Sequence, residues 1–185
     1  MRTFQSNDNS AIRMPASHLH TPDRLCQDGR MHQVQASDEI ELRSAREVFS
    51  ALAGTWELSR TIGEWNFHGS AVFCAGEPDK LQYEENGTLA KPGGADIQAS
   101  RRYVYRYEAS RIVVYFDERP ARIFEVLAPK RAPNGTWEAR AEHLCPPDHY
   151  ASRYVFGPDT IVIVHVVRGP RKDYEMVSNY RLVSR

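Results

Sequence analysis

Two histidines in the second half of the chain are the residues best suited to acid–base chemistry. His143 continues an alternating set with Ala139 and Ala141, and His165 alternates with Ile163. An imidazole titrates near neutral pH, so either side chain could act as a general acid or base. A histidine on an apolar face is also a common structural residue, and the pattern leaves both interpretations open.

Charged and phenolic side chains occupy further positions that alternation directs to the side of apolar residues. Arg60 shares a strand face with Trp56 and Leu58, and Glu85 shares one with Tyr83. An unpaired buried charge is costly, so Arg60 and Glu85 are a candidate internal pair. Such a set either fixes the fold as a polar network or lines a cavity for a carboxylate, phenolate or carbonyl group. The predicted ligand-binding residues are Arg60, Tyr83, Glu85, Arg101, Tyr103, Tyr105, Tyr154, Lys172, Tyr174 and Tyr180.

Other chemistry fits the sequence less well. His143, Cys145 and His149 match no standard zinc spacing, and Cys145 lies at a strand end with no clear oxyanion donor. Arg171 or Lys172, in the basic segment from 168 to 174, could instead gate an anionic ligand at a hairpin turn. We therefore expect no metal and no cofactor. Proton transfer by His143 or His165, of the isomerase, cyclase or dehydratase type on a natural-product-like substrate, is the better catalytic hypothesis.

Period-two alternation from Thr55 onward predicts the elements that position these side chains. About ten short strands follow one another with no second long helix between them. Parallel strands would need crossover helices, so we expect an all-β, closed or nearly closed, antiparallel up-and-down barrel. Asn86-Gly87 is a strong tight-turn signal, and it predicts the end of the strand that begins at Leu81.

A short helix precedes the first strand. Ser37 to Glu39 can begin it, and Val48, Phe49 and Leu52 recur at helical spacing. Gly54-Thr55-Trp56 then opens the first strand, as in calycin-type barrels, where the indole closes one end of the barrel. A basic residue of the last strand packs over it in such barrels, and Arg181 is the candidate here. The sequence is therefore similar to lipocalin-like, or calycin-like, barrels.

The N-terminal region differs from the rest of the chain. Residues 1 to about 37 are polar, aperiodic and poor in aromatic residues, so we expect a disordered or loosely docked tail, with the barrel domain over 38–185. The histidines and cysteine within this tail form no compact metal-ligand motif.

Composition limits the partner classes. The 185 residues carry 24 Lys+Arg and 24 Asp+Glu, so no global field favours nucleic acid or an anionic membrane. The N-terminal residues lack the apolar core of a signal peptide, and no apolar run is long enough to span a membrane. The three cysteines have no framework spacing, which predicts reduced thiols in a cytoplasmic protein. We expect a small-molecule partner, with no nucleic acid and no membrane.

Longer motifs carry a resemblance to a family. Tyr83-Glu84-Glu85-Asn86-Gly87, Glu142 to Tyr150 and above all Gly169-Pro170-Arg171-Lys172-Asp173-Tyr174 resemble the domain-of-unknown-function family numbered 6314 (DUF6314), over residues 48 to 183. The resemblance implies the barrel architecture and implies no activity. Many members have an aromatic residue and His where this chain has Ala121-Arg122, and they tend to have Trp at the position of His165. The departures imply a more polar interior here.

Two functional hypotheses follow. The first is a non-catalytic binder of a small amphipathic or anionic organic molecule in a polar barrel cavity. The second is a cofactor-independent enzyme that uses His143 or His165 in the same cavity.

Overall fold

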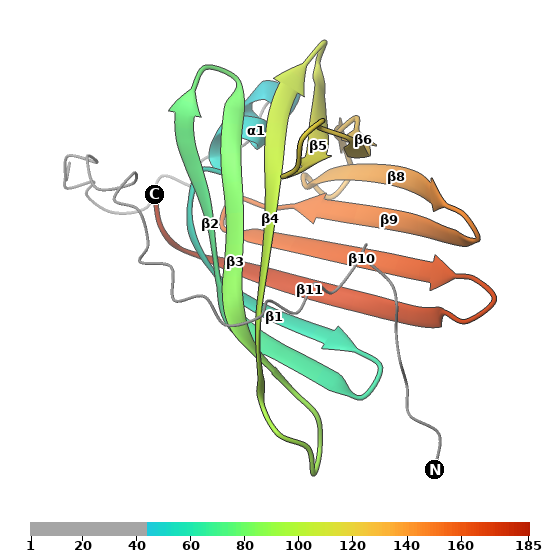
Figure 1. Ribbon diagram of the computed structural model, residues 1–185. Helices are drawn as coiled ribbons and strands as arrows, with labels where there is room; N and C mark the ends of the chain where they lie inside the picture. The colour runs from blue at the N-terminus through green and yellow to red at the C-terminus, as the bar shows by residue number, and fades with distance from the viewer. Residues whose placement is uncertain (1–43) are drawn as a thin grey trace.

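The computed structural model describes residues 44–185 and shows one short helix followed by antiparallel strands (Figure 1). The bounds are α1 Ala45–Ala51, β1 Gly54–Ile62, β2 Trp65–Glu77, β3 Lys80–Ala90, β4 Ile97–Glu108, β5 Arg111–Phe116, β6 Ile123–Leu127, β7 Lys130–Arg131, β8 Trp137–Cys145, β9 Asp148–Phe156, β10 Thr160–Arg168 and β11 Asp173–Ser184.

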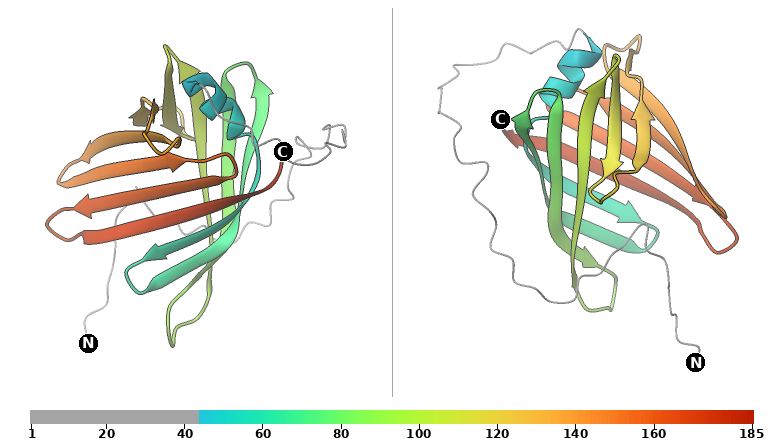
Figure 2. Two further views of the ribbon diagram at one scale, coloured as in Figure 1. Left: turned by 180° about the vertical axis from the view of Figure 1, so that it is seen from behind. Right: turned by 45° about the horizontal axis from the view of Figure 1, so that its top comes forward.

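The strands form one sheet that curls into a half-barrel (Figures 1 and 2). Their order is β6-β5-β4-β3-β2-β1-β11-β10-β9-β8-β7, so each strand pairs with its neighbours in sequence and β1 pairs with β11. Within residues 44–185, no backbone ladder joins β6 to β7 or β8 at the two ends of this order. The predicted all-β, up-and-down antiparallel fold is confirmed, while full closure is slightly overstated. The extra strand relative to the predicted ten is the two-residue β7.

Alternation along each strand builds the core on the concave face of the sheet. In β1, for example, Trp56, Leu58 and Arg60 are buried, while Glu57 and Thr61 are exposed. Apolar area removed from water supplies the main driving force for this arrangement. The buried hydrophobic cluster includes Trp56, Leu58, Phe67, Phe73, Leu81, Tyr83, Ile112, Val114, Leu127, Tyr154, Phe156 and Ile161.

Helix α1 lies at one end of the curled sheet (Figure 2). Its N-cap is Ser44, whose side chain accepts a hydrogen bond from the backbone N–H of Glu47 at 3.2 Å. The predicted apolar face is confirmed, because Val48, Phe49 and Leu52 are buried. The predicted start at Ser37 to Glu39, like the predicted tail over 1–37 and the domain boundary at residue 38, lies outside the described residues.

The prediction for Trp56 is correct in part, and the one for Arg181 is wrong. Trp56 is buried beside the helix, and its indole N–H donates to the carbonyl oxygen of Leu52 at 2.8 Å. Arg181 lies opposite Glu57 in the β1–β11 register and pairs with that carboxylate on the exposed face, with Nε–Oε2 at 3.0 Å. Because neighbouring residues of a strand face opposite sides, Arg181 cannot cover Trp56.

Asn86-Gly87 is also not a turn. Both residues lie inside β3, where Gly87 pairs with Gly69 of β2. A Cβ atom on Gly87 would lie 2.4 Å from the carbonyl oxygen of His68 and 2.6 Å from the ring of Phe67. Close approach of the two strands therefore explains this glycine, since only glycine leaves room for both contacts.

Cys145 is a free cysteine and is partly buried. The predicted reduced state of the three cysteines involves Cys26, which lies outside the described residues. The described part of the chain contains no helix with the length and hydrophobicity needed to cross a bilayer.

Candidate functional site

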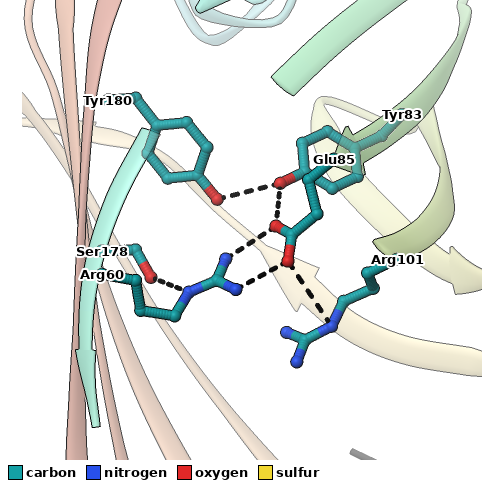
Figure 3. Close-up of polar contacts among 6 residues, drawn as sticks. All are labelled: Arg60, Tyr83, Glu85, Arg101, Ser178 and Tyr180. Atoms are coloured by element: carbon teal, nitrogen blue, oxygen red, sulfur yellow. Dashed lines mark hydrogen bonds and ion pairs between the residues drawn. The ribbon is translucent and has the colours of Figure 1, made fainter. Parts of the chain in front are cut away.

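A buried ion pair joins β1 to β3 on the core side of the sheet (Figure 3). The Arg60 guanidinium donates to both oxygens of Glu85, with Nη1–Oε1 at 2.6 Å and Nη2–Oε2 at 2.7 Å. The two residues are only 5% and 3% exposed. They come from β1 and β3, which both pair with β2, where Phe67 lies opposite Arg60 and Ala71 lies opposite Glu85. The internal pair predicted from the sequence is confirmed.

Further polar groups complete this cluster, which we call the arginine cluster. Arg60 Nε donates to Ser178 Oγ at 2.7 Å, and Tyr83 donates to Glu85. Tyr83 and Tyr180 are linked through their hydroxyl groups at 3.1 Å. Arg101, directly opposite Glu85 in the β3–β4 register, brings its Nε to 3.8 Å from Oε1. Four predicted ligand-binding residues therefore meet around Glu85 (Figure 3), namely Arg60, Tyr83, Arg101 and Tyr180.

The arginine cluster stays ionised at neutral pH. Burial alone would raise the pKa of Glu85, but the hydrogen bonds from Arg60 and the charge of Arg101 lower it to about 2. Burial disfavours the charged form of Arg60 too, yet the same contacts with Glu85 raise its pKa well above the ordinary value. Burial raises the pKa of Tyr83 and of Tyr180, so both phenols remain neutral donors.

The low pKa of Glu85 predicts an acid-sensitive fold. A folded-state pKa below the ordinary 4.5 means that the ionised carboxylate stabilises the protein fully above about pH 4.5 and loses this effect as the pH falls toward 2. The difference corresponds to about 3 kcal/mol. In urea titrations between pH 5 and pH 2, Glu85→Gln should therefore lose less stability than the wild type. Glu84→Gln, on the opposite face of β3, should keep most of the wild-type slope. Equal slopes for the wild type and Glu85→Gln would contradict this assignment.

A second buried cluster, which we call the glutamate cluster, lies where β6 approaches β9 and β10. Glu125 of β6 is 1% exposed and accepts hydrogen bonds from Ser152 and Tyr154 of β9. Ala139 and Ala141 face the same two β9 residues from β8, and their small side chains leave the space that Glu125 fills. Side-chain hydrogen bonds thus connect β6 to β9, although no backbone ladder joins these two strands.

His165 of β10 completes the glutamate cluster. Its Nε2 lies 3.5 Å from Glu125 Oε1, and neither ring nitrogen has a hydrogen-bond partner among the described residues. Burial alone would raise the pKa of Glu125, but His165 and the hydroxyl groups of Ser152 and Tyr154 lower it below the ordinary value. The cluster therefore holds a buried carboxylate next to an unsatisfied imidazole.

Sequence reasoning included His165 and Tyr154 among the site residues but missed Glu125. The available signal was the alternation of Glu125 with Leu127, which faces the core at 0% exposure. The same pattern had identified Glu85, and applied to this short strand it would have placed a second carboxylate inside the barrel.

Aromatic rings connect the two clusters along the concave face. Tyr103 and Phe124 stack with centroids 5.3 Å apart and planes 9° apart, and Phe116 lies 5.1 Å from Phe124. His143 lies 5.5 Å from Phe124, and these four rings are all partly exposed. We call Tyr103, Phe116, Phe124 and His143 the ring cluster. Tyr105, also predicted, instead packs in the core 5.2 Å from Phe73.

Lys172 and Tyr174 lie apart from these groups, near the β8–β9 and β10–β11 turns. Lys172 Nζ lies 2.9 Å from Asp148 Oδ2 and donates to the hydroxyl group of Tyr150 at 3.1 Å. Tyr174 is half-buried on β11. A surface hollow of about 380 Å³ adjoins this pair and is lined by Cys145, Pro146, Pro147, Asp148, Pro170, Arg171 and Lys172.

The histidine and cysteine residues of β8 and β9 do not converge. His143 faces the concave side, whereas His149 lies on the exposed face with its Nε2 3.6 Å from Glu142. Within residues 44–185, no three histidine, cysteine or acidic side chains come close enough together to hold a metal ion.

The fold and its interior define a class: an up-and-down, lipocalin-like half-barrel with ionisable groups on its concave face. The chain belongs to the family of unknown function DUF6314, whose model matches residues 52–182. The predicted family membership is therefore confirmed. No protein of curated function matches the sequence.

Solved structures of similar fold are distant in sequence. Rv2717c from M. tuberculosis is 13% identical with a TM-score of 0.55, covering 77% of this chain and 99% of its own. The S-type phycobiliprotein lyase CPES from Guillardia theta is 12% identical with a TM-score of 0.49, covering 76% and 93%. The redesigned β-barrel mFAP1, bound to DFHBI, is 11% identical with a TM-score of 0.40, covering 72% and 97%. The first of these supports the barrel fold.

Proposed function

We propose that the concave face binds a small amphipathic organic anion, with its acidic group at Arg101 and its apolar part on the ring cluster. The observation that carries this proposal is the accessibility of these groups. The Arg101 side chain is 23% exposed although it lies beside the buried Glu85, and the adjoining rings are partly exposed on the same face. Aromatic surface next to a cationic donor is the composition expected of a small-molecule site.

The geometry around Glu85 supports the role of Arg101. Arg60 already donates to both Glu85 oxygens, and Tyr83 donates to one of them. Arg101 approaches through Nε at 3.8 Å, which is longer than a hydrogen bond. Its two terminal nitrogens turn away from Glu85 (Figure 3). A guanidinium group is well suited to an organic acid, because it can donate two parallel N–H bonds to a carboxylate.

A fluorescence titration with 6-methoxy-2-naphthoate tests the proposal. Arg101→Gln should weaken binding by about tenfold or more, because a charge-assisted bidentate contact is lost. Arg102→Gln is the matched control, because Arg102 is the next residue of β4 and points to the opposite face of the sheet. There it pairs with Glu84 at 3.2 Å. The methyl ester of the probe should bind the wild type weakly, which tests the charge without any variant. Equal binding of acid and ester would overturn the proposal.

A second candidate function, acid–base catalysis, is favoured by the two imidazoles near one ring. The ring centroids of His143 and His165 lie 5.5 and 6.3 Å from that of Phe124. The two histidines belong to β8 and β10, which flank β9. The corresponding enzyme would move protons on a bound substrate, as an isomerase, cyclase or dehydratase does. Proton NMR of 2-tetralone in D2O tests this, because a catalytic base accelerates exchange of the protons beside the carbonyl group. Acceleration that His143→Ala or His165→Gln abolishes favours the enzyme, and exchange at the buffer rate favours the binder.

A further inference from the structure

We infer that His165, positioned by Glu125, accepts the proton of an ionisable hydroxyl group on the bound molecule. This inference rests on the proposed anion site and narrows the ligand to a class, an acid that also carries a phenol or an enol. Arg101 would hold the acidic group, and the glutamate cluster would receive the hydroxyl group.

The first observation is the unsatisfied imidazole. The side chain of His165 is only 10% exposed, and both of its nitrogens are buried without a hydrogen-bond partner in the described part of the chain. Buried polar atoms are nearly always hydrogen-bonded, and each exception costs free energy. A ligand that supplies the partner would recover this cost on binding.

The second observation fixes which nitrogen is available. Nε2 faces the Glu125 carboxylate at 3.5 Å, and hydroxyl groups of Ser152 and Tyr154 hold that carboxylate in place. A carboxylate beside one ring nitrogen favours the tautomer that carries its proton there. Nδ1 is then the hydrogen-bond acceptor, and it is the atom that can take a proton from a ligand.

Phe124 controls access to the imidazole. Its ring stacks on His165, with centroids 6.3 Å apart and planes 23° apart. The same ring also stacks on Tyr103, with centroids 5.3 Å apart. Phe124 is partly exposed and belongs to β6, the strand that no backbone ladder joins to β8. An aromatic ligand can therefore take the place of the Phe124 ring beside Tyr103 and bring its hydroxyl group to His165.

The proton transfer is balanced within the site. The O–H bond of the ligand breaks, an N–H bond forms at Nδ1, and the ligand oxygen keeps the electron pair as a phenolate or enolate. The imidazolium that results lies beside the Glu125 carboxylate, whose negative charge stabilises its positive charge. No oxidant, reductant or further reactant takes part.

A matched pair of probes tests the inference on the full-length protein. The wild type should bind 6-hydroxy-2-naphthoate about tenfold more tightly than 6-methoxy-2-naphthoate, and the bound hydroxy probe should show naphtholate absorption at neutral pH. His165→Gln should abolish both the preference and the absorption while binding of the methoxy probe persists. His149→Gln is the control, because its imidazole also faces a glutamate but lies on the exposed face.

The outcomes separate this inference from the proposed function. Equal binding of the two probes, or naphtholate absorption that survives in His165→Gln, overturns the inference and leaves the anion site intact. Failure of both acids to bind overturns the anion site and the inference together. Phe124→Ala gives a second measurement. Both probes lose the apolar contact with this ring, so the ratio of hydroxy-probe to methoxy-probe affinity is compared. Removal of the covering ring should raise this ratio, and an unchanged or lower ratio would show that access does not pass this side chain.

Discussion

Replacement of Arg60 by leucine is expected to destabilise the protein by about 3–5 kcal/mol. The substitution leaves the Glu85 carboxylate, 3% exposed, without the bidentate donor that keeps it ionised, and removes the partner of Ser178. Breaking a buried ion pair from one side is costly because the remaining charge stays out of water. Urea unfolding followed by circular dichroism at pH 7 measures the loss.

Two comparisons isolate the cause of that loss. Arg102→Leu removes an exposed pair with Glu84 and should cost less than about 1 kcal/mol. The double variant Arg60→Leu/Glu85→Leu should recover much of the stability, since apolar residues of similar volume can replace a buried pair. A loss for Arg60→Leu no larger than that of Arg102→Leu would show that the arginine cluster contributes little to the fold.

Glu125→Ala is expected to cost about 3 kcal/mol and to loosen β6 selectively. The substitution removes the acceptor of Ser152 and Tyr154, leaving two buried hydroxyl groups unsatisfied, and also opens a cavity beside Ala141. Since side chains rather than a backbone ladder connect β6 to the opposite wall, amide hydrogen exchange should rise more in β6 than in β2.

Glu138→Ala is the matched control for this prediction. Glu138 lies on β8 and pairs with Arg153 on the outer face at 2.9 Å, where both side chains remain accessible to solvent. Its removal should cost less than about 1 kcal/mol and leave exchange in β6 unchanged. Uniform exchange across the sheet in Glu125→Ala would instead mean that this carboxylate does not hold the end of the sheet in place.

Local alternation was sufficient to predict the inward-facing residues of long strands. It placed Arg60, Glu85 and His165 inside the barrel, because each lies in a strand of nine or more residues with apolar neighbours at every second position. Helical spacing likewise predicted the buried face formed by Val48 and Phe49. These features depend on contacts between near neighbours in the sequence, which the pattern records directly.

Features that depend on strand register were not predictable in this way. The β1–β11 register places Leu182 opposite Trp56 and Arg181 opposite Glu57, so Arg181 faces the other side of the sheet from Trp56. The turn signal of Asn86-Gly87 was overridden by the close approach of β2 and β3 at Gly87. The role of Glu125 depends on small residues of another strand, Ala139 and Ala141, and no local pattern links these positions.

A crystallographic screen of small aromatic carboxylates tests the proposed anion site on the concave face. We expect carboxylate groups within hydrogen-bond distance of the guanidinium of Arg101, with the attached rings against Tyr103 and Phe116. Fragments bound only elsewhere, with the space beside Arg101 empty or filled by side chains of the protein itself, would contradict it.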